Sequence, residues 1–163
     1  MESEVTLLLR IVDQAFEKKA WHGPNLRGSL RGVSARDADW RPGAGRHNIR
    51  EIAVHAAYWK YAARRRLLGG KRGSFPLRGS NWLRRPGKLD EKSWRADIAL
   101  LVEEHRALRK AIAGLKRADL SKRSPGSYVD NAMLIYGIAS HDLYHAGQIQ
   151  LIKRLRHSGV PAR

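Results

Sequence analysis

The sequence contains no cysteine, which excludes disulfide bonds and thiolate metal sites. Any transition-metal site must therefore use imidazole and carboxylate ligands, so the search narrows to His, Asp and Glu. Long hydrophobic runs are also missing, because no apolar segment approaches the roughly 18 to 20 residues that cross a bilayer. The first ten residues do not show the basic-then-apolar order of a signal peptide. We therefore expect a cytoplasmic protein that does not bind membranes.

Acidic residues are scarce, with 15 Asp and Glu against 32 Lys and Arg, and the formal net charge is +17. Residues 60–88 hold ten Lys or Arg residues and no Asp or Glu. Such a segment could bind nucleic-acid phosphates, an anionic substrate or an acidic partner. It could equally be a solvated basic surface, because charge by itself reports solubility rather than function. Phe75 and Trp82 stand too far apart in the sequence to predict a stacking platform for bases.

Helical periodicity dominates the sequence, and no alternating apolar and polar run is long enough to predict a sheet. A chain of 163 residues, 42% of them hydrophobic, suits a single domain over residues 1–163 that buries a core. No internal repeat is present. We therefore predict an all-α domain.

The first two predicted helices lie on either side of a break. An apolar stripe from Val5 to Phe16 predicts the first helix, and Pro24 forces a kink or a restart, with the proline in the new first turn. Residues 34–45 are predicted to form a loop. Asn48 can cap the second helix, with Glu51 completing a capping box, and this helix should run to about Leu68 before Gly69 and Gly70.

The second half of the chain predicts two more helices. Residues 71–88 are too long for a simple bundle turn, so they predict a crossover connection or a functional loop. Apolar residues spaced by four and three predict a third helix that begins near Asp90, and residues 118–127 form the next loop. The fourth helix should start near Ser127 or Asp130. Four helices of comparable length indicate a four-helix bundle.

Three histidines lie on apolar helix stripes, where Leu or Ile would be expected. His141 and His145 are four residues apart, so their imidazoles share one helix face and could share one ion. His55 lies on the inward stripe of the second helix. Burying imidazoles without partners costs a few kcal/mol, and a metal ion gives all three a partner. The alternative for each residue is an ordinary core or surface histidine.

Two motifs carry a family resemblance. Residues 40–42 (Trp-Arg-Pro) and 47–52, followed by His55 and Trp59, resemble the second-helix signature of DinB-like proteins. Residues 141–149, His-Asp-Leu-Tyr-His-Ala-Gly-Gln-Ile, resemble the more diagnostic fourth-helix motif of that superfamily. With Trp94 at the start of the third helix, the resemblance spans nearly the whole chain.

This resemblance implies a four-helix bundle with up-down-down-up connectivity, in which His55, His141 and His145 hold one divalent metal ion. Zinc and nickel both suit three imidazole ligands. The resemblance also implies a homodimer, and the small residues Gly137, Ala146 and Gly147 could mark its interface. Characterised members of the superfamily include transferases and isomerases that use bacillithiol or mycothiol.

Four further residues are candidate accessories to this site. His22 could be a fourth ligand or a general base, or else a loop or helix-cap imidazole. Gln148 could contact a metal-bound water, or bond to backbone as a buried amide. His105 could support a ligand, or be a hydrogen-bonded core histidine. Asp142 could orient a neighbouring ligand or contact another helix.

The leading functional hypothesis is a metal-dependent enzyme, either a hydrolase or a thiol transferase, that acts on a small molecule. Its substrate could be anionic or a low-molecular-weight thiol. An alternative is a basic, nucleic-acid-associated stress-response bundle with a structural metal. A third hypothesis is a metal-free bundle in which the histidines only pack.

Overall fold

The computed structural model describes residues 2–73, 75–83, 85, 89–125 and 127–158. Each regular element in this part of the chain is a helix, which confirms the all-α prediction. The helices are α1 (Glu4–Phe16), α2 (Leu26–Ser29), α3 (Ala35–Asp39), α4 (Ile49–Leu67), α5 (Glu91–Ala113), the 3-10 helix η1 (Arg117–Asp119) and α6 (Asn131–His157). Within the described ranges, none of them combines the length and the apolar character that crossing a membrane requires.

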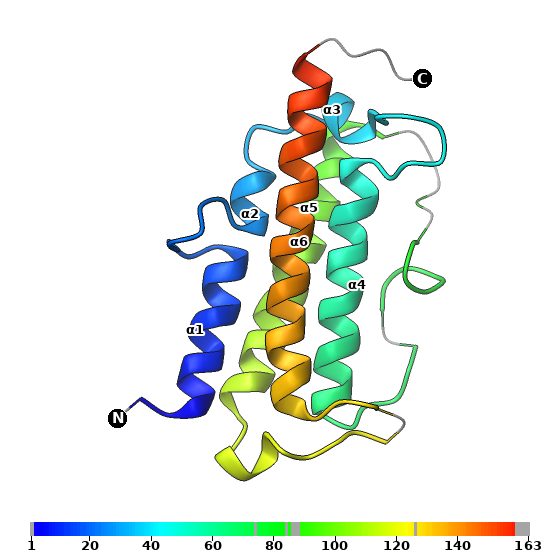
Figure 1. Cartoon of the computed structure of the whole chain (residues 1–163). Coiled ribbons are helices and arrows are strands. Elements are labelled where there is room, and N and C mark those ends of the chain that lie inside the picture. Colours follow the sequence, from blue (N-terminus) through cyan, green and yellow to red (C-terminus); the bar gives the residue numbers. More distant parts are fainter. Residues whose placement is uncertain (1, 74, 84, 86–88, 126, 159–163) are drawn as a thin grey trace.

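The long helices α1, α4, α5 and α6 lie side by side along the long axis of the molecule (Figure 1). Helix α4 packs against α5 and α6, and α1 packs against the same two helices. The segment between α4 and α5 returns along the outer side of α4 (Figure 1). The core between the helices is built mainly from aliphatic side chains and Phe16, among them Val12, Ile52, Leu101, Leu108, Ile135 and Ile149.

The predicted starts of the three longest helices are confirmed. Asn48 caps α4, because its side-chain oxygen accepts from the Glu51 N–H at 2.9 Å, and the Glu51 carboxylate accepts from the Asn48 N–H at 3.3 Å. The Asp90 side chain accepts from the Ser93 N–H in a second capping box, and the Asp130 side chain accepts from the Met133 N–H at the start of α6. Gly69 follows the end of α4 with φ 64°, a left-handed conformation that glycine adopts without steric cost.

The predicted restart is confirmed, because α1 ends at Phe16 and α2 begins at Leu26. Two other predictions near the N-terminus are wrong. Pro24 does not lie in the first turn of the new helix, because Asn25 caps α2 by accepting from the Gly28 N–H at 2.8 Å. The predicted loop at residues 34–45 contains α3, since the Ser34 hydroxyl accepts from the Asp37 N–H at 3.1 Å and starts a helical turn. Local capping residues, which the apolar pattern does not show, therefore determine where α2 and α3 begin.

A buried ion pair joins α4 to α6. The Lys60 ammonium donates to the Asp142 carboxylate, and both residues are fully buried. The Lys60 Nζ also lies 4.7 Å from the centre of the Phe16 ring. Asp142 therefore contacts another helix, which is one of the two roles that the sequence suggested for it.

His105 on α5 is a packing residue. Its imidazole is buried and stacks on Phe16 with ring centres 3.8 Å apart. Neither of its ring nitrogens has a hydrogen-bond partner among the described residues. The prediction of a hydrogen-bonded core histidine is therefore wrong in its hydrogen bond, although the residue does lie in the core. The nearest carboxylate oxygen, on Asp13, is 3.9 Å from Nε2. Burial, helped by the positive charge of Lys60, lowers the pKa of His105 to about 2.

Replacement of His105 with Leu is expected to weaken the acid sensitivity of the fold. The unfolded chain takes up a proton below the ordinary His pKa of about 6.5, whereas the folded chain keeps His105 neutral down to about 2. Stability from this residue is therefore complete above pH 6.5 and is lost as the pH falls. Between pH 8 and pH 5 this loss is about 2 kcal/mol.

Urea unfolding of chelator-treated protein at both pH values measures this difference. The H105L variant should lose about 2 kcal/mol less than the wild type between pH 8 and pH 5. The matched control is H157L, which removes a histidine of α6 that is exposed rather than buried. Equal pH dependence in H105L and in the wild type would contradict the assignment.

Candidate metal centre

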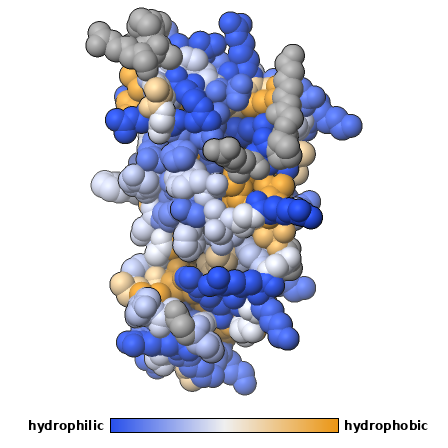
Figure 2. Space-filling model, turned by 90° about the vertical axis from the view of Figure 1, so that its right-hand side faces the viewer, coloured by the Kyte–Doolittle hydropathy of each residue, from blue (hydrophilic) through white to orange (hydrophobic). Residues whose placement is uncertain are grey.

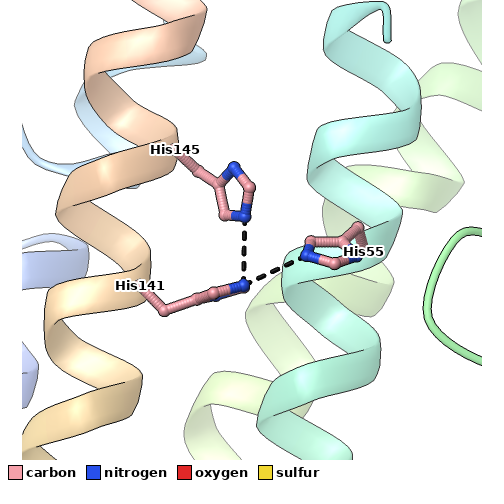
Figure 3. Close-up of side chains that lie close together, drawn as sticks. All are labelled: His55, His141 and His145. Atoms are coloured by element: carbon pink, nitrogen blue, oxygen red, sulfur yellow. Dashed lines mark hydrogen bonds between the residues drawn. The ribbon is translucent and has the colours of Figure 1, made fainter.

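The imidazoles of three histidines meet between α4 and α6. His55 projects from α4 towards His141 and His145, which lie one turn apart on α6 (Figure 3). The Nε2 atom of His141 lies 3.1 Å from Nε2 of His55 and 3.0 Å from Nε2 of His145. His55 and His145 are buried, and His141 is partly exposed. The structure thus brings together the three residues that helical spacing had singled out.

The imidazoles of His55 and His145 are each held in one tautomer by the hydrogen bond that Nδ1 makes. His55 Nδ1 lies 3.2 Å from the Asn81 carbonyl oxygen, which can only accept, so Nδ1 donates. His145 Nδ1 lies 2.7 Å from the Gln148 side-chain oxygen and donates to it. The Gln148 amide in turn donates to the Tyr144 hydroxyl at 3.1 Å. Both Nε2 atoms therefore direct a lone pair at the centre of the cluster.

This arrangement fits a divalent metal ion. Nε2 of His141 carries at most one proton, which cannot satisfy the lone pairs of His55 and His145 together. An ion bound tetrahedrally at about 2.0 to 2.1 Å holds neighbouring nitrogens about 3.3 Å apart. The ligand atoms of the three residues all lie within 4.8 Å of one another. The cluster could therefore hold a metal ion after small shifts of the rings.

Burial keeps these imidazoles neutral at neutral pH. Loss of hydration, reinforced by the neighbouring histidines, lowers the pKa of His55 to about 4 and that of His141 to about 3. Burial also lowers the pKa of His145. Neutral imidazole is the form that binds metals, so the site does not have to lose protons before an ion enters.

The segment after α4 closes one side of the cluster. Trp82 lies between two imidazoles and stacks on His47 at 3.5 Å and on His55 at 3.8 Å between ring centres. Asn81 has φ 60°, and its side-chain oxygen accepts from the Trp59 indole N–H at 3.0 Å. Sequence reasoning missed both Asn81 and Trp82 as site residues, because loop residues carry no periodic signal.

An apolar cavity of about 300 Å³ borders His141. Trp59 and Ala63 of α4 and Gly137 of α6 contribute to its wall. Arg66 is its one basic lining residue among those described. We name this space the apolar cavity. It gives a small molecule a place beside the imidazole cluster.

The structure separates His22 from the cluster. His22 is exposed and borders a pocket with Ala146, Gly147 and Gln150 of α6, and none of the three clustered histidines contributes to that pocket. Ala146 and Gln150 lie on the side of α6 that faces away from His141 and His145, given 3.6 residues per turn. The role predicted for His22 therefore has no geometric support and stays a prediction.

Gln148 lies directly behind His145 rather than in front of the cluster. Its contacts go to the His145 ring and to Tyr144, not to backbone as one of the sequence-based alternatives proposed. Gln148 therefore orients a candidate ligand. Its predicted contact with a metal-bound water stays a prediction.

Comparisons with curated proteins and with solved structures found no match. The family model of the DinB superfamily matches residues 20–149. The matched span contains His55, His141 and His145, together with all of α4 and α5. The chain therefore belongs to the DinB superfamily.

Proposed function

We propose that His55, His141 and His145 bind one zinc or nickel ion through Nε2, and that the chain is a metal-dependent enzyme acting on a small molecule. One observation carries this proposal: three Nε2 atoms converge while the Nδ1 atoms of His55 and His145 are occupied by acceptors. Three neutral imidazoles suit either ion, and three protein ligands leave a coordination position open, as in catalytic sites.

The bound ion would lower the pKa of a water or a substrate thiol, which makes that group a nucleophile near neutral pH. The proposed reaction is hydrolysis or thiol transfer. Asn81 and Gln148 hold two ligand rings in the orientation that the ion needs. Trp82 and Trp59 exclude water from one side of the cluster, and the apolar cavity receives the apolar part of the substrate.

The domain organisation, the helix connectivity and the oligomeric state are also part of this proposal. We infer one domain, arranged as an up-down-down-up four-helix bundle, that works in the cytoplasm as a homodimer. The packing of α1 and α4 against both α5 and α6 supports the bundle. The outer face of α6 supports the dimer, because residues spaced by four and three along it include exposed apolar side chains and small residues: Met133, Gly137, Ser140, Tyr144, Gly147 and Leu151.

The Q148L variant tests this function through an orienting residue. Leu cannot accept from the His145 N–H, so the imidazole loses the bond that fixes its tautomer. Loss of such a bond lowers metal affinity by about 10- to 100-fold. Competition with a chromogenic chelator measures this affinity for zinc and for nickel. The matched control is Q150L, two residues along α6, which should keep the wild-type affinity.

The same preparations allow turnover to be measured. Activated esters test hydrolysis, and electrophiles supplied with a low-molecular-weight thiol test thiol transfer. Activity should vanish with the chelator, return with added zinc or nickel, and need more metal in Q148L than in Q150L. Turnover that persists in the chelator, or equal metal affinity in the two variants, would count against the proposed function.

A further inference from the structure

A second cavity, of about 790 Å³, lies between α4 and the segment that follows it. Helix α4 contributes one continuous face, from Tyr58 to Arg66, and residues 72, 73 and 75–81 supply the rest of the described lining. Figure 2 looks onto the side of the molecule where this segment runs, and strongly hydrophilic side chains cover most of it, with hydrophobic patches between them. We name this space the arginine cavity.

Four arginines border the arginine cavity, namely Arg65, Arg66, Arg72 and Arg78, and its described lining includes no Asp or Glu. Arg65 donates to the Gly70 carbonyl oxygen at 3.1 Å. Across the described ranges, no carboxylate pairs with any of the four guanidinium groups. Four arginines therefore line a shared space in which the described residues supply no negative charge.

Several arginines outside the lining of the arginine cavity pair with carboxylates. Arg64 does not border the cavity, and its Nη2 lies 3.1 Å from the Glu104 carboxylate. Arg50 pairs with Asp97 at 2.6 Å, and Arg109 pairs with Asp13 at 2.8 Å. Guanidinium groups bind phosphate and carboxylate through two parallel hydrogen bonds, so an unpaired set around a cavity is suited to an anionic ligand.

The walls of the arginine cavity also carry aromatic rings. Tyr58 and Phe75 meet edge to face with ring centres 5.5 Å apart, and Phe75 lies 5.3 Å from Tyr61. Aromatic rings in this arrangement can pack against an aromatic ring or an apolar group of a ligand. The chemistry of the cavity therefore suits a molecule that joins an anionic group to an aromatic or apolar part.

Two residues connect this cavity with the imidazole cluster. Trp59 borders both the arginine cavity and the apolar cavity, and its ring centre lies 6.3 Å from that of His55 and 6.3 Å from that of His141. Asn81 borders the arginine cavity and accepts from His55 Nδ1 through its carbonyl. A ligand held by the arginines would thus lie next to the residues that orient the cluster.

We infer that the arginine cavity binds the phosphate, phosphonate or carboxylate group of a small aromatic or apolar molecule, which is the substrate class of the adjacent metal centre. The assignment as substrate rests on the proposed function. Anion binding by the cavity does not, because the four arginines are not ligands of the ion. Anion binding by the cavity and the assignment of the anion as substrate can therefore be refuted separately.

The test is calorimetric titration of the full chain with phenylphosphonate, which joins an aromatic ring to a non-hydrolysable anion. The R72A/R78A variant removes two of the four charges and should weaken binding about tenfold or more. Its control is R95A/R123A, which removes two exposed arginines outside the cavity and should change affinity less than about twofold. Benzyl alcohol, which lacks the charge, should not bind measurably.

A further titration, of H141A, separates the cavity from the metal, because phosphonate could otherwise bind the ion directly. Retained phenylphosphonate affinity in H141A shows that the ion does not bind the ligand, and weaker binding in R72A/R78A then places the ligand in the cavity. Equal weakening in R72A/R78A and R95A/R123A would overturn the inference, as would loss of binding in H141A. It would also be overturned if duplex DNA bound through Arg72 and Arg78, with steep salt dependence, while phenylphosphonate did not bind.

Inhibition of turnover tests whether the ligand of the arginine cavity belongs to the substrate class of the metal centre. If phenylphosphonate slows metal-dependent turnover in the wild type and does so about tenfold less effectively in R72A/R78A, the cavity serves the metal centre. If it binds in the cavity and leaves turnover unchanged, the substrate assignment fails while anion binding stands. A chain that binds phenylphosphonate and no metal would refute the proposed function alone.

Discussion

Replacement of His141 with Ala is expected to abolish stoichiometric binding of zinc or nickel. His141 is the central member of the cluster, with Nε2 3.1 Å from His55 Nε2 and 3.0 Å from His145 Nε2. Loss of a residue that only orients a ligand lowers metal affinity by about 10- to 100-fold, and loss of a ligand must cost more than that. Elemental analysis after gel filtration at micromolar protein would then find almost no metal.

The control for this experiment is H22A. Sequence reasoning placed His22 beside the open metal position, whereas the structure places it in a pocket on the opposite side of α6. H22A should therefore keep the full metal content. Far-UV circular dichroism should show equal helix content in both variants, so that a loss of metal is not a loss of fold. Undiminished metal in H141A would contradict the site.

Replacement of Asp142 with Ala is expected to lower the free energy of unfolding by about 3 to 5 kcal/mol. The Lys60 ammonium is fully buried, and the Phe16 ring, 4.7 Å from Nζ, carries no charge that could replace the carboxylate. An unpaired buried charge costs far more than a lost surface pair. Urea unfolding at pH 7 measures the change, on chelator-treated protein so that metal binding does not contribute.

Two further variants identify the cause of this loss. The double variant K60M/D142L replaces the pair by apolar side chains of similar size and should recover most of the stability, because neither charge is then left alone. E4A removes one partner of the exposed Arg117–Glu4 pair and should cost less than about 1 kcal/mol. A D142A loss as small as that of E4A would show that Lys60 reaches water.

Features set by local sequence could be predicted. The Asn48 and Glu51 capping box depends on residues three apart, and the structure contains it as predicted. His141 and His145 share a helix face because of their spacing, and His55 lies on the inward stripe of α4, so the cluster of three imidazoles could be predicted from helical periodicity. The family motif pointed to the same residues.

Features set by long-range contacts could not be predicted. Asn81 lies in an irregular segment, and only the folded chain brings its carbonyl to His55, 26 residues away. Trp82 showed no stacking partner in the sequence, yet its partners are the His47 and His55 rings. His22 lies in the irregular segment between α1 and α2, and its sequence gave no information about which side of α6 it would face.

The most direct test of the metal centre is an anomalous-scattering map from crystals of the purified protein, collected on both sides of the zinc and nickel absorption edges. The proposal predicts one strong peak at about 2.0 to 2.1 Å from Nε2 of each of His55, His141 and His145. A map without a peak there, in crystals grown with either ion at saturating concentration, would contradict it.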